Sequence, residues 1–250
     1  MQIRKWMQVV CFSAACVLLN SAGIHHAGAA TVLDIGFEVS EGYSTGNLSG
    51  QNSWVGDSDA RIEVGDSLAK TGTQSLELNG RGSSSTILEN YLPFDAVSGE
   101  FVWEFAVHGN GVINSVDNFI RLSDTGNDKY AVHLLLDGKG YSGFSINYVD
   151  VGGVHELVLI DDDNWHAVKI VGDTADDKFD FYLDGNLESS ANPFHEDVDD
   201  LANLSVGSEQ YSGGAYQMYV DDVKLTGVPE PATLALLSVG AGMMLRRRRL

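Results

Sequence analysis

Cysteine is nearly absent from this 250-residue chain, and the only two, Cys11 and Cys16, lie within the first twenty residues. The apolar run around them has the features of a removable leader, described below. Without that run the remaining protein has no thiol and cannot form a disulfide. Outside the cell its stability must then come from metal binding or from a hydrophobic core, for which the 44 % of hydrophobic residues is sufficient.

Positive charge is also scarce, because 15 Lys and Arg stand against 35 Asp and Glu and give a formal net charge of -20. Six of these 15 cations lie at the two ends of the chain, as Arg4, Lys5 and Arg246–Arg249. The middle of the chain is therefore strongly acidic, which excludes nucleic acid as a partner, since phosphate binding needs a basic surface. Acidity of this kind suits solubility and the binding of divalent cations.

Long helical periods are missing between Thr31 and Gly227, where apolar and polar residues alternate instead. In EFVWEFAVH, residues 100–108, every second side chain is apolar, which is typical of a half-buried strand. Turn-forming clusters rich in Gly, Asp and Asn separate such segments. The pattern predicts an all-β, two-sheet antiparallel sandwich. Its expected strands also include Val32–Glu38, Gln74–Asn79, Asn118–Ser123, Tyr130–Leu136, Gly143–Tyr148, His155–Ile160, Trp165–Val171, Lys178–Leu183 and Gln217–Thr226.

The first thirty residues have the three parts of a secretory signal peptide. Two basic residues near the start precede a short apolar stretch, Val9–Leu19, and an A-x-A site follows at Ala27–Ala29. We expect a signal helix here, with cleavage at Ala29 or Ala30. The apolar stretch is too short for a comfortable bilayer span. This assigns residues 1–30 to the signal peptide and residues 31–227 to the sandwich domain.

Three segments of the middle resemble the laminin-G and concanavalin-A-like jelly rolls. NWHAVKI at Asn164–Ile170 and FYLDG at Phe181–Gly185 match their W-H-x-V and Y-x-D-G pair, and YVDDVKL at Tyr219–Leu225 is similar to a closing strand. With IGFE at Ile35–Glu38, the closing segment also resembles calcium-stabilised carbohydrate-binding jelly rolls. The resemblance implies a jelly roll whose first and last strands lie side by side.

The closing strand contains a carboxylate at an unexpected position. Asp221 shares its parity with Tyr219, Val223 and Leu225, so strict alternation would turn it toward the core. An inward carboxylate is costly unless it is paired or bound to metal. Glu38 on the adjacent first strand could join it, and two carboxylates with backbone carbonyls suit a structural Ca²⁺ ion. The alternative is a bulge that reverses the parity and leaves Asp221 in solvent.

Motifs of common catalytic sites are missing as well. The chain has no G-x-S-x-G, H-E-x-x-H or glycine-rich phosphate loop, and its scattered histidines lack metal-ligand spacing. The E-x-D-x-x-E string of the jelly-roll glycoside hydrolases is not found, although Glu100 and Glu104 share a strand face. We therefore expect no enzymatic activity, with a site assembled from distant strands as the alternative. Tyr148 and Tyr182 are candidates for stacking on a sugar.

The end of the chain reads VPEPATLALLSVGAGMMLRRRRL. A proline-bracketed glutamate precedes an uncharged stretch, Ala232–Leu245, which as a helix spans about 21 Å against the roughly 30 Å of a bilayer core. The terminal arginines would stay on the cytoplasmic side. The pattern predicts a C-terminal transmembrane helix that stops export and tethers the body outside the inner membrane. The residues of this signal are Pro229, Glu230, Pro231, Arg246, Arg247, Arg248 and Arg249.

This three-part tail, residues 228–250, resembles the PEP-CTERM sorting signal. The resemblance implies recognition by an exosortase of a Gram-negative bacterium, cleavage near the Pro-Glu-Pro motif, and delivery to the cell surface or the extracellular matrix. Together with the jelly-roll resemblance it suggests a non-catalytic protein that binds polysaccharide or matrix. A purely structural envelope or biofilm component and a glycan-active enzyme are the alternatives.

Overall fold

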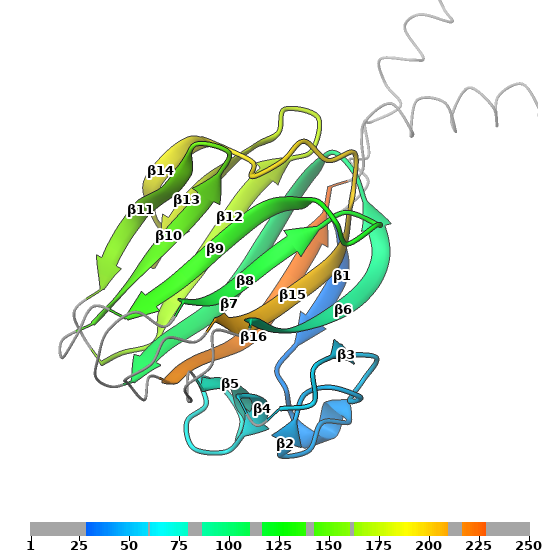
Figure 1. The fold of residues 1–250 in the computed structure, drawn as a ribbon, viewed down its shortest axis with the longest axis vertical. Helices are drawn as coiled ribbons and strands as arrows, with labels where there is room; N and C mark the ends of the chain where they lie inside the picture. Colours follow the sequence, from blue (N-terminus) through cyan, green and yellow to red (C-terminus); the bar gives the residue numbers. More distant parts are fainter. Residues whose placement is uncertain are drawn as a thin grey trace, which may run out of the picture. The chain divides into compact units, whose positions relative to one another are not determined.

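The alternating segments form two antiparallel β-sheets, which the computed structural model describes over residues 29–59, 61–79, 87–110, 117–138, 143–160, 163–209 and 217–228 (Figure 1). They lie in one compact unit, Ala29–Glu230. The expected signal helix, the expected transmembrane helix, the Pro-Glu-Pro motif and the arginine cluster lie outside the described residues. Among the described residues, no helix is long and apolar enough to span a membrane.

One sheet has nine strands and follows the order β14-β13-β12-β7-β16-β5-β4-β2, with β1 paired to β16. The first and last strands of the unit thus lie side by side, and Ala30 faces Gly227 across the pair. The strands are β1 Ala30–Ile35, β2 Gly46–Asn47, β4 Ile62–Gly65, β5 Ser75–Asn79, β7 Glu100–Asn110, β12 His166–Asp173, β13 Lys178–Leu183, β14 Asn186–Pro193 and β16 Gln217–Gly227.

The other sheet has seven strands in the order β11-β10-β9-β8-β15-β6-β3. Its strands are β3 Val55–Gly56, β6 Ile87–Val97, β8 Asp117–Ser123, β9 Tyr130–Gly138, β10 Phe144–Asp150, β11 Gly153–Ile160 and β15 Leu201–Glu209. A short 3₁₀ helix, η1 (Val39–Glu41), follows β1. The all-β, two-sheet antiparallel prediction is confirmed.

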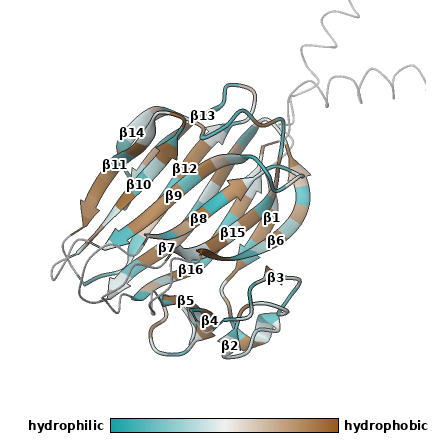
Figure 2. Cartoon of the chain, in the orientation of Figure 1, coloured by the Kyte–Doolittle hydropathy of each residue, from teal (hydrophilic) through white to brown (hydrophobic). Residues whose placement is uncertain are grey.

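The core lies between the inner faces of the sheets. On β7 the side chains of Phe101, Trp103 and Val107 are fully buried, whereas Glu104 is exposed, as the period of two predicts. Hydrophobic and hydrophilic segments alternate along many strands in the same way (Figure 2). Burial of large side chains of this kind contributes about 1.5–3 kcal/mol each. A continuous core of this size explains how the body dispenses with disulfides.

Candidate functional site

A row of outward-facing residues crosses the middle of the seven-stranded sheet. Tyr91 on β6 faces Ser205 on β15, which faces Arg121 on β8, which faces His133 on β9. Their chain neighbours, such as Leu122, belong to the buried core. The row therefore points away from the core, yet Arg121 is only 7 % exposed and Ser205 is 0 % exposed. Other outward-facing side chains must cover them.

A second row, two residues along, provides part of that cover. Glu89 on β6 faces Gly207 on β15, which faces Phe119 on β8. A Cβ atom on Gly207 would lie 2.0 Å from the Phe119 ring and 2.4 Å from the carbonyl oxygen of Leu88. Real contacts are never this short, so glycine is required here. The Phe119 ring lies across β15 because position 207 has no side chain.

Arg121 lies at the centre of a group that we call the Arg121 cluster. Its guanidinium carbon is 3.8 Å from the centroid of the Tyr130 ring and 4.5 Å from that of Phe119. Its Nη2 donates to Oε2 of Glu89 at 2.5 Å. Cation–π contacts of a desolvated guanidinium stabilise by about 2 kcal/mol. The cluster consists of Glu89, Phe119, Arg121, Tyr130, His133 and His195.

Three rings of the cluster lie next to one another. The centroids of Tyr130, His133 and His195 are 5.7 to 6.0 Å apart in all three pairs. His195 belongs to the segment after β14, whose backbone runs along the start of β9. There the His195 N–H donates to the carbonyl of Ala131 at 2.8 Å, and the Glu196 N–H donates to that of Tyr130 at 2.9 Å. These bonds fix His195 beside the outer face.

Burial keeps His133 uncharged. Its pKa falls to about 3, mainly because burial penalises the imidazolium and further because Arg121 and His195 lie nearby. A neutral imidazole still has one N–H donor and one acceptor nitrogen. Within the described part of the chain, neither ring nitrogen of His133 has a hydrogen-bond partner. His133 is therefore a neutral group with two unsatisfied polar atoms.

Several unsatisfied buried atoms lie in this region. An unpaired buried donor or acceptor costs about 1–3 kcal/mol, so such groups need an explanation, and one is a binding role. On the outer face the buried side-chain atoms without a partner among the described residues are His133 Nδ1 and Nε2, His195 Nδ1, Arg121 Nε, Glu89 Oε1 and Ser205 Oγ. Donors and acceptors are both represented, which suits a ligand rich in hydroxyl groups.

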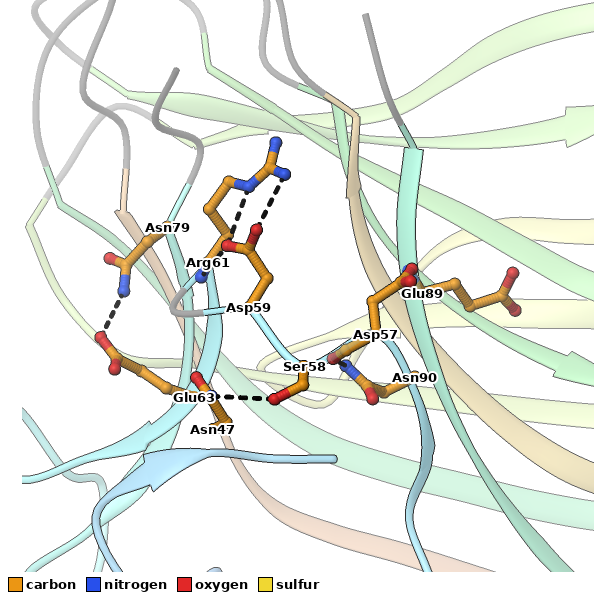
Figure 3. A network of polar contacts seen from close by, with 9 residues as sticks. All are labelled: Asn47, Asp57, Ser58, Asp59, Arg61, Glu63, Asn79, Glu89 and Asn90. Atoms are coloured by element: carbon orange, nitrogen blue, oxygen red, sulfur yellow. Dashed lines mark hydrogen bonds and ion pairs between the residues drawn. The ribbon is translucent and has the colours of Figure 1, made fainter. Parts of the chain in front are cut away.

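The segment after β3 holds the Glu89 end of the cluster in place. The N–H of Glu89 donates to Oδ2 of Asp57 at 3.0 Å, and the Asp57 N–H donates to the carbonyl of Glu89 at 3.1 Å. Asn90 Nδ2 donates to the carbonyl of Asp57 at 3.2 Å. Figure 3 shows the Glu89 carboxylate pointing away from Asp57 and Asn90. The backbone is thus anchored on one side while the carboxylate reaches Arg121 on the other.

Asp221 does not point toward the core, which corrects the expectation from strict alternation. Asp222 has φ 52°, and the pairing of β16 with β7 shifts between Asp221 and Lys224. This bulge turns Asp221 to the outer side of the nine-stranded sheet, while Val223 faces inward. Asp221 is nevertheless 0 % exposed. The bulge alternative was right about the parity but wrong about exposure to solvent.

The loop between β4 and β5 covers Asp221. Oδ2 of Asp221 accepts the N–H groups of Lys70 and Thr71 at 2.9 and 3.2 Å. Oε1 of Glu38 accepts those of Thr73 and Gln74 at 2.7 and 2.9 Å. The two carboxylates predicted from the sequence therefore bind neighbouring residues of one loop. Their role in the described structure is to hold this loop against the sheet.

The pKa values of these two carboxylates are shifted in opposite directions. Burial raises the pKa of Asp221 to about 6 against the opposing effect of its N–H donors. The N–H groups of Gln74 and Thr73 lower the pKa of Glu38. Two hard oxygen donors fit calcium chemically. However, no group of three or more His, Cys, Asp or Glu side chains in the described ranges is arranged to hold a metal, and calcium stays a prediction.

The two tyrosines considered for sugar stacking lie on different sheets. Tyr148 packs edge-on against Phe179 at 5.7 Å between ring centroids, which places it at the rim of the core. Tyr182 lies on β13 of the other sheet, with the Lys169 ammonium 5.6 Å from its centroid. They do not form a common platform.

Comparison with known protein families identifies the tail. Residues 227–249 match the PEP-CTERM protein-sorting motif, so the chain carries this sorting signal. Curated protein sequences give no match to the chain.

Several solved structures share the fold. A sialidase superposes with a TM-score of 0.60 at 13 % identity, over 80 % of this chain but only 19 % of the sialidase. The carbohydrate esterase vb_24B_21 from the Shiga toxin-encoding bacteriophage phi24B has a TM-score of 0.57 at 13 % identity, over 81 % of this chain and 100 % of the esterase. The endo-β-1,4-glucuronan lyase of the fungus Trichoderma reesei has a TM-score of 0.50 at 14 % identity, over 73 % and 93 %. At such identities the likeness shows the β-sandwich jelly-roll fold alone.

Proposed function

We propose that this protein is exported, is tethered through its tail to the inner membrane of a Gram-negative bacterium, and is released there by an exosortase. The sorting motif at residues 227–249 supports this route. Ala30 opens β1 and Gly227 ends β16, so cleavage at Ala29 and near the Pro-Glu-Pro motif leaves both sheets whole. The product is a surface or matrix protein.

The body binds polysaccharide through the outer face of the seven-stranded sheet without cleaving it. The observation that carries this proposal is the Arg121 cluster, where aromatic rings lie beside buried polar atoms that lack protein partners. Rings offer flat apolar surfaces to sugars, while the polar atoms offer hydrogen bonds to hydroxyl groups. The three similar structures named above are a sialidase, a carbohydrate esterase and a glucuronan lyase, which is in keeping with a carbohydrate ligand.

Catalysis is the second candidate, because the neutral His133 and the hydroxyl of Tyr130 could act as base and acid. Against hydrolysis, the cluster has a single carboxylate, Glu89, and this carboxylate is paired to Arg121. Most glycoside hydrolases use two carboxyl groups, one on either side of the bond. We therefore favour binding.

The test is an array of bacterial and plant polysaccharides probed with the exported protein, with and without calcium. We expect retention on at least one polysaccharide and loss of retention in Tyr130→Ala and His195→Ala, which alter partly exposed side chains. Tyr182→Ala, on the other sheet, is the matched control and should bind normally. No retention on any polysaccharide would favour a purely structural component, and release of shortened or unsaturated sugars would favour an enzyme.

A further inference from the structure

The Glu89–Arg121 ion pair crosses over a strand that separates its two members. Arg121 is on β8 and Glu89 is on β6, with β15 between them. Where the pair crosses, β15 presents only Ser205 and Gly207 on this face. The Phe119 ring fills the space above Gly207, and the guanidinium that bonds the carboxylate lies over this ring at 4.5 Å. The pair thus forms the floor of the outer face instead of a solvated surface bridge.

Each member of this pair keeps one polar atom without a partner in the described part of the chain. Nη2 of Arg121 bonds Oε2 of Glu89, while the donor Nε of Arg121 and the acceptor Oε1 of Glu89 are buried without a partner. Oγ of Ser205, on the strand beneath, is unpartnered as well. The buried atoms without a partner at this point are therefore a donor, an acceptor and a hydroxyl that can act as either.

A sugar hydroxyl matches this set and a carboxylate does not. One hydroxyl donates to Oε1 of Glu89 while it or its neighbour accepts from Nε of Arg121. A uronic-acid carboxylate has only acceptor atoms, so it would face the Glu89 carboxylate with no proton between them. Like charges at such range repel.

The charge of the surroundings also disfavours the binding of acidic sugars. The guanidinium of the cluster is already neutralised by Glu89, and His133 adds no charge because its pKa lies near 3. The whole chain carries a net charge of -20. Such a surface repels polyanions over about 10 Å at ordinary ionic strength.

Access to the floor is controlled by Tyr130. Its ring lies 3.8 Å from the guanidinium carbon and is partly exposed, so a ligand meets this ring before it reaches the ion pair. We propose that the ligand turns the Tyr130 ring aside and that the Glu89–Arg121 pair then selects neutral, hydroxyl-rich sugars over uronic-acid sugars. This inference rests on the proposed glycan binding and adds the class of sugar.

The experiment measures binding of the exported protein, in the form recovered after processing, by isothermal titration calorimetry. The probes are three matched pairs of oligosaccharides: glucan and glucuronan, galactan and galacturonan, mannan and mannuronan. We expect at least one neutral member to bind about tenfold or more tightly than its acidic counterpart, because the acidic member has a carboxylate in place of the C6 hydroxyl and therefore cannot donate from C6 to Glu89 and is repelled by it. This preference is measured on the wild-type protein and needs no variant.

Two variants then locate the preference. Glu89→Gln should reduce the neutral-to-acidic ratio several-fold, since it removes the repelling charge, and Arg121→Lys should weaken neutral binding about tenfold. Glu104→Gln, an exposed carboxylate on the other sheet, is the control and should leave the ratio unchanged. Tighter binding of the acidic members, or a ratio unaffected by both variants, would overturn this inference while glycan binding stands. Binding of none of the six probes, together with an empty array, would overturn both.

Discussion

Glu38 and Asp221 are far apart in the sequence, near the first and the last strand of the sandwich domain, yet their carboxylates accept backbone N–H groups from the same loop between β4 and β5. The pairing of β1 with β16 brings them together. The loop thus closes over the seam where the chain begins and ends. Any event that alters the charge of these two groups, such as cation binding or protonation, acts directly on this seam.

Calcium removal tests the metal prediction for this seam. If Ca²⁺ binds Glu38 and Asp221, a chelator lowers the midpoint of thermal unfolding, because an ion present at a hundred times its Kd stabilises by about 2.7 kcal/mol. The measurement is a melt with calcium and with EDTA. Glu38→Gln with Asp221→Asn should abolish the difference. An identical midpoint under both conditions would show that the loop is held by hydrogen bonds alone.

The dependence of stability on pH should include two opposing contributions. The pKa of Asp221 is raised to about 6, so its contribution is present below pH 3.8 and is lost as pH rises through 6. The pKa of His133 is lowered to about 3, so its contribution is present above pH 6.5 and is lost as pH falls toward 3.

Chemical unfolding at pH 4, 5, 6 and 7 measures both contributions. His133→Gln should retain more of its pH 7 stability at pH 4 than wild type does, and Asp221→Asn should gain most at pH 7. Parallel curves for all three proteins would contradict these assignments.

Gly207→Ala tests whether Phe119 needs the space above β15. The new methyl group would meet the Phe119 ring and the Leu88 carbonyl, so the ring must move and the protein should lose about 1–3 kcal/mol of stability. The displaced ring should also weaken glycan binding. Gly36→Ala is a suitable control, because its Cβ would make only ordinary contacts, 3.5 Å and longer. Equal stability of the two variants would show that Phe119 does not depend on Gly207.

Processing of the tail is tested by mass spectrometry of the protein recovered from the cell surface or medium. Cleavage near Pro229–Pro231 predicts that no peptide from Leu234 onward is found, while peptides of β16 are recovered. Ala30 should be close to the first residue, as expected for signal cleavage. An intact arginine end on the surface-exposed product would contradict processing and favour a permanent anchor.

Most of the fold follows from periodicity, because half-buried strands such as β7 alternate clearly. Three long strands were not predicted. β6 contains Pro93, β14 is mostly polar, and β15 reads LANLSVGSE with small residues on its outer side. Their pairing partners define them more than their own composition does. Alternation also failed at Asp222, where a residue with positive φ is not recognisable from a single sequence.

The Arg121 cluster was not predicted, since its members come from four separate segments that only the sheet order brings together. In the sequence, His133 and His195 are two of several histidines without metal-ligand spacing. A signal was nevertheless present in FIRL, where Arg121 sits between Ile120 and Leu122 at an outward position of an expected strand. In a body with so few cations, an arginine at the centre of a sheet is unusual and indicates a partner. The strand register was needed to identify Glu89 as that partner.

The most direct test of the account is NMR mapping of the binding surface on the isotopically labelled exported protein, titrated with the best polysaccharide fragment from the array. The account predicts that the largest shifts occur at the amides of Arg121, His133 and Ser205 and at the side chains of the Arg121 cluster. Residues on the outer face of the nine-stranded sheet, such as Lys169, should be unaffected. Shifts confined to that other face, with the Arg121 cluster unchanged at saturation, would contradict it.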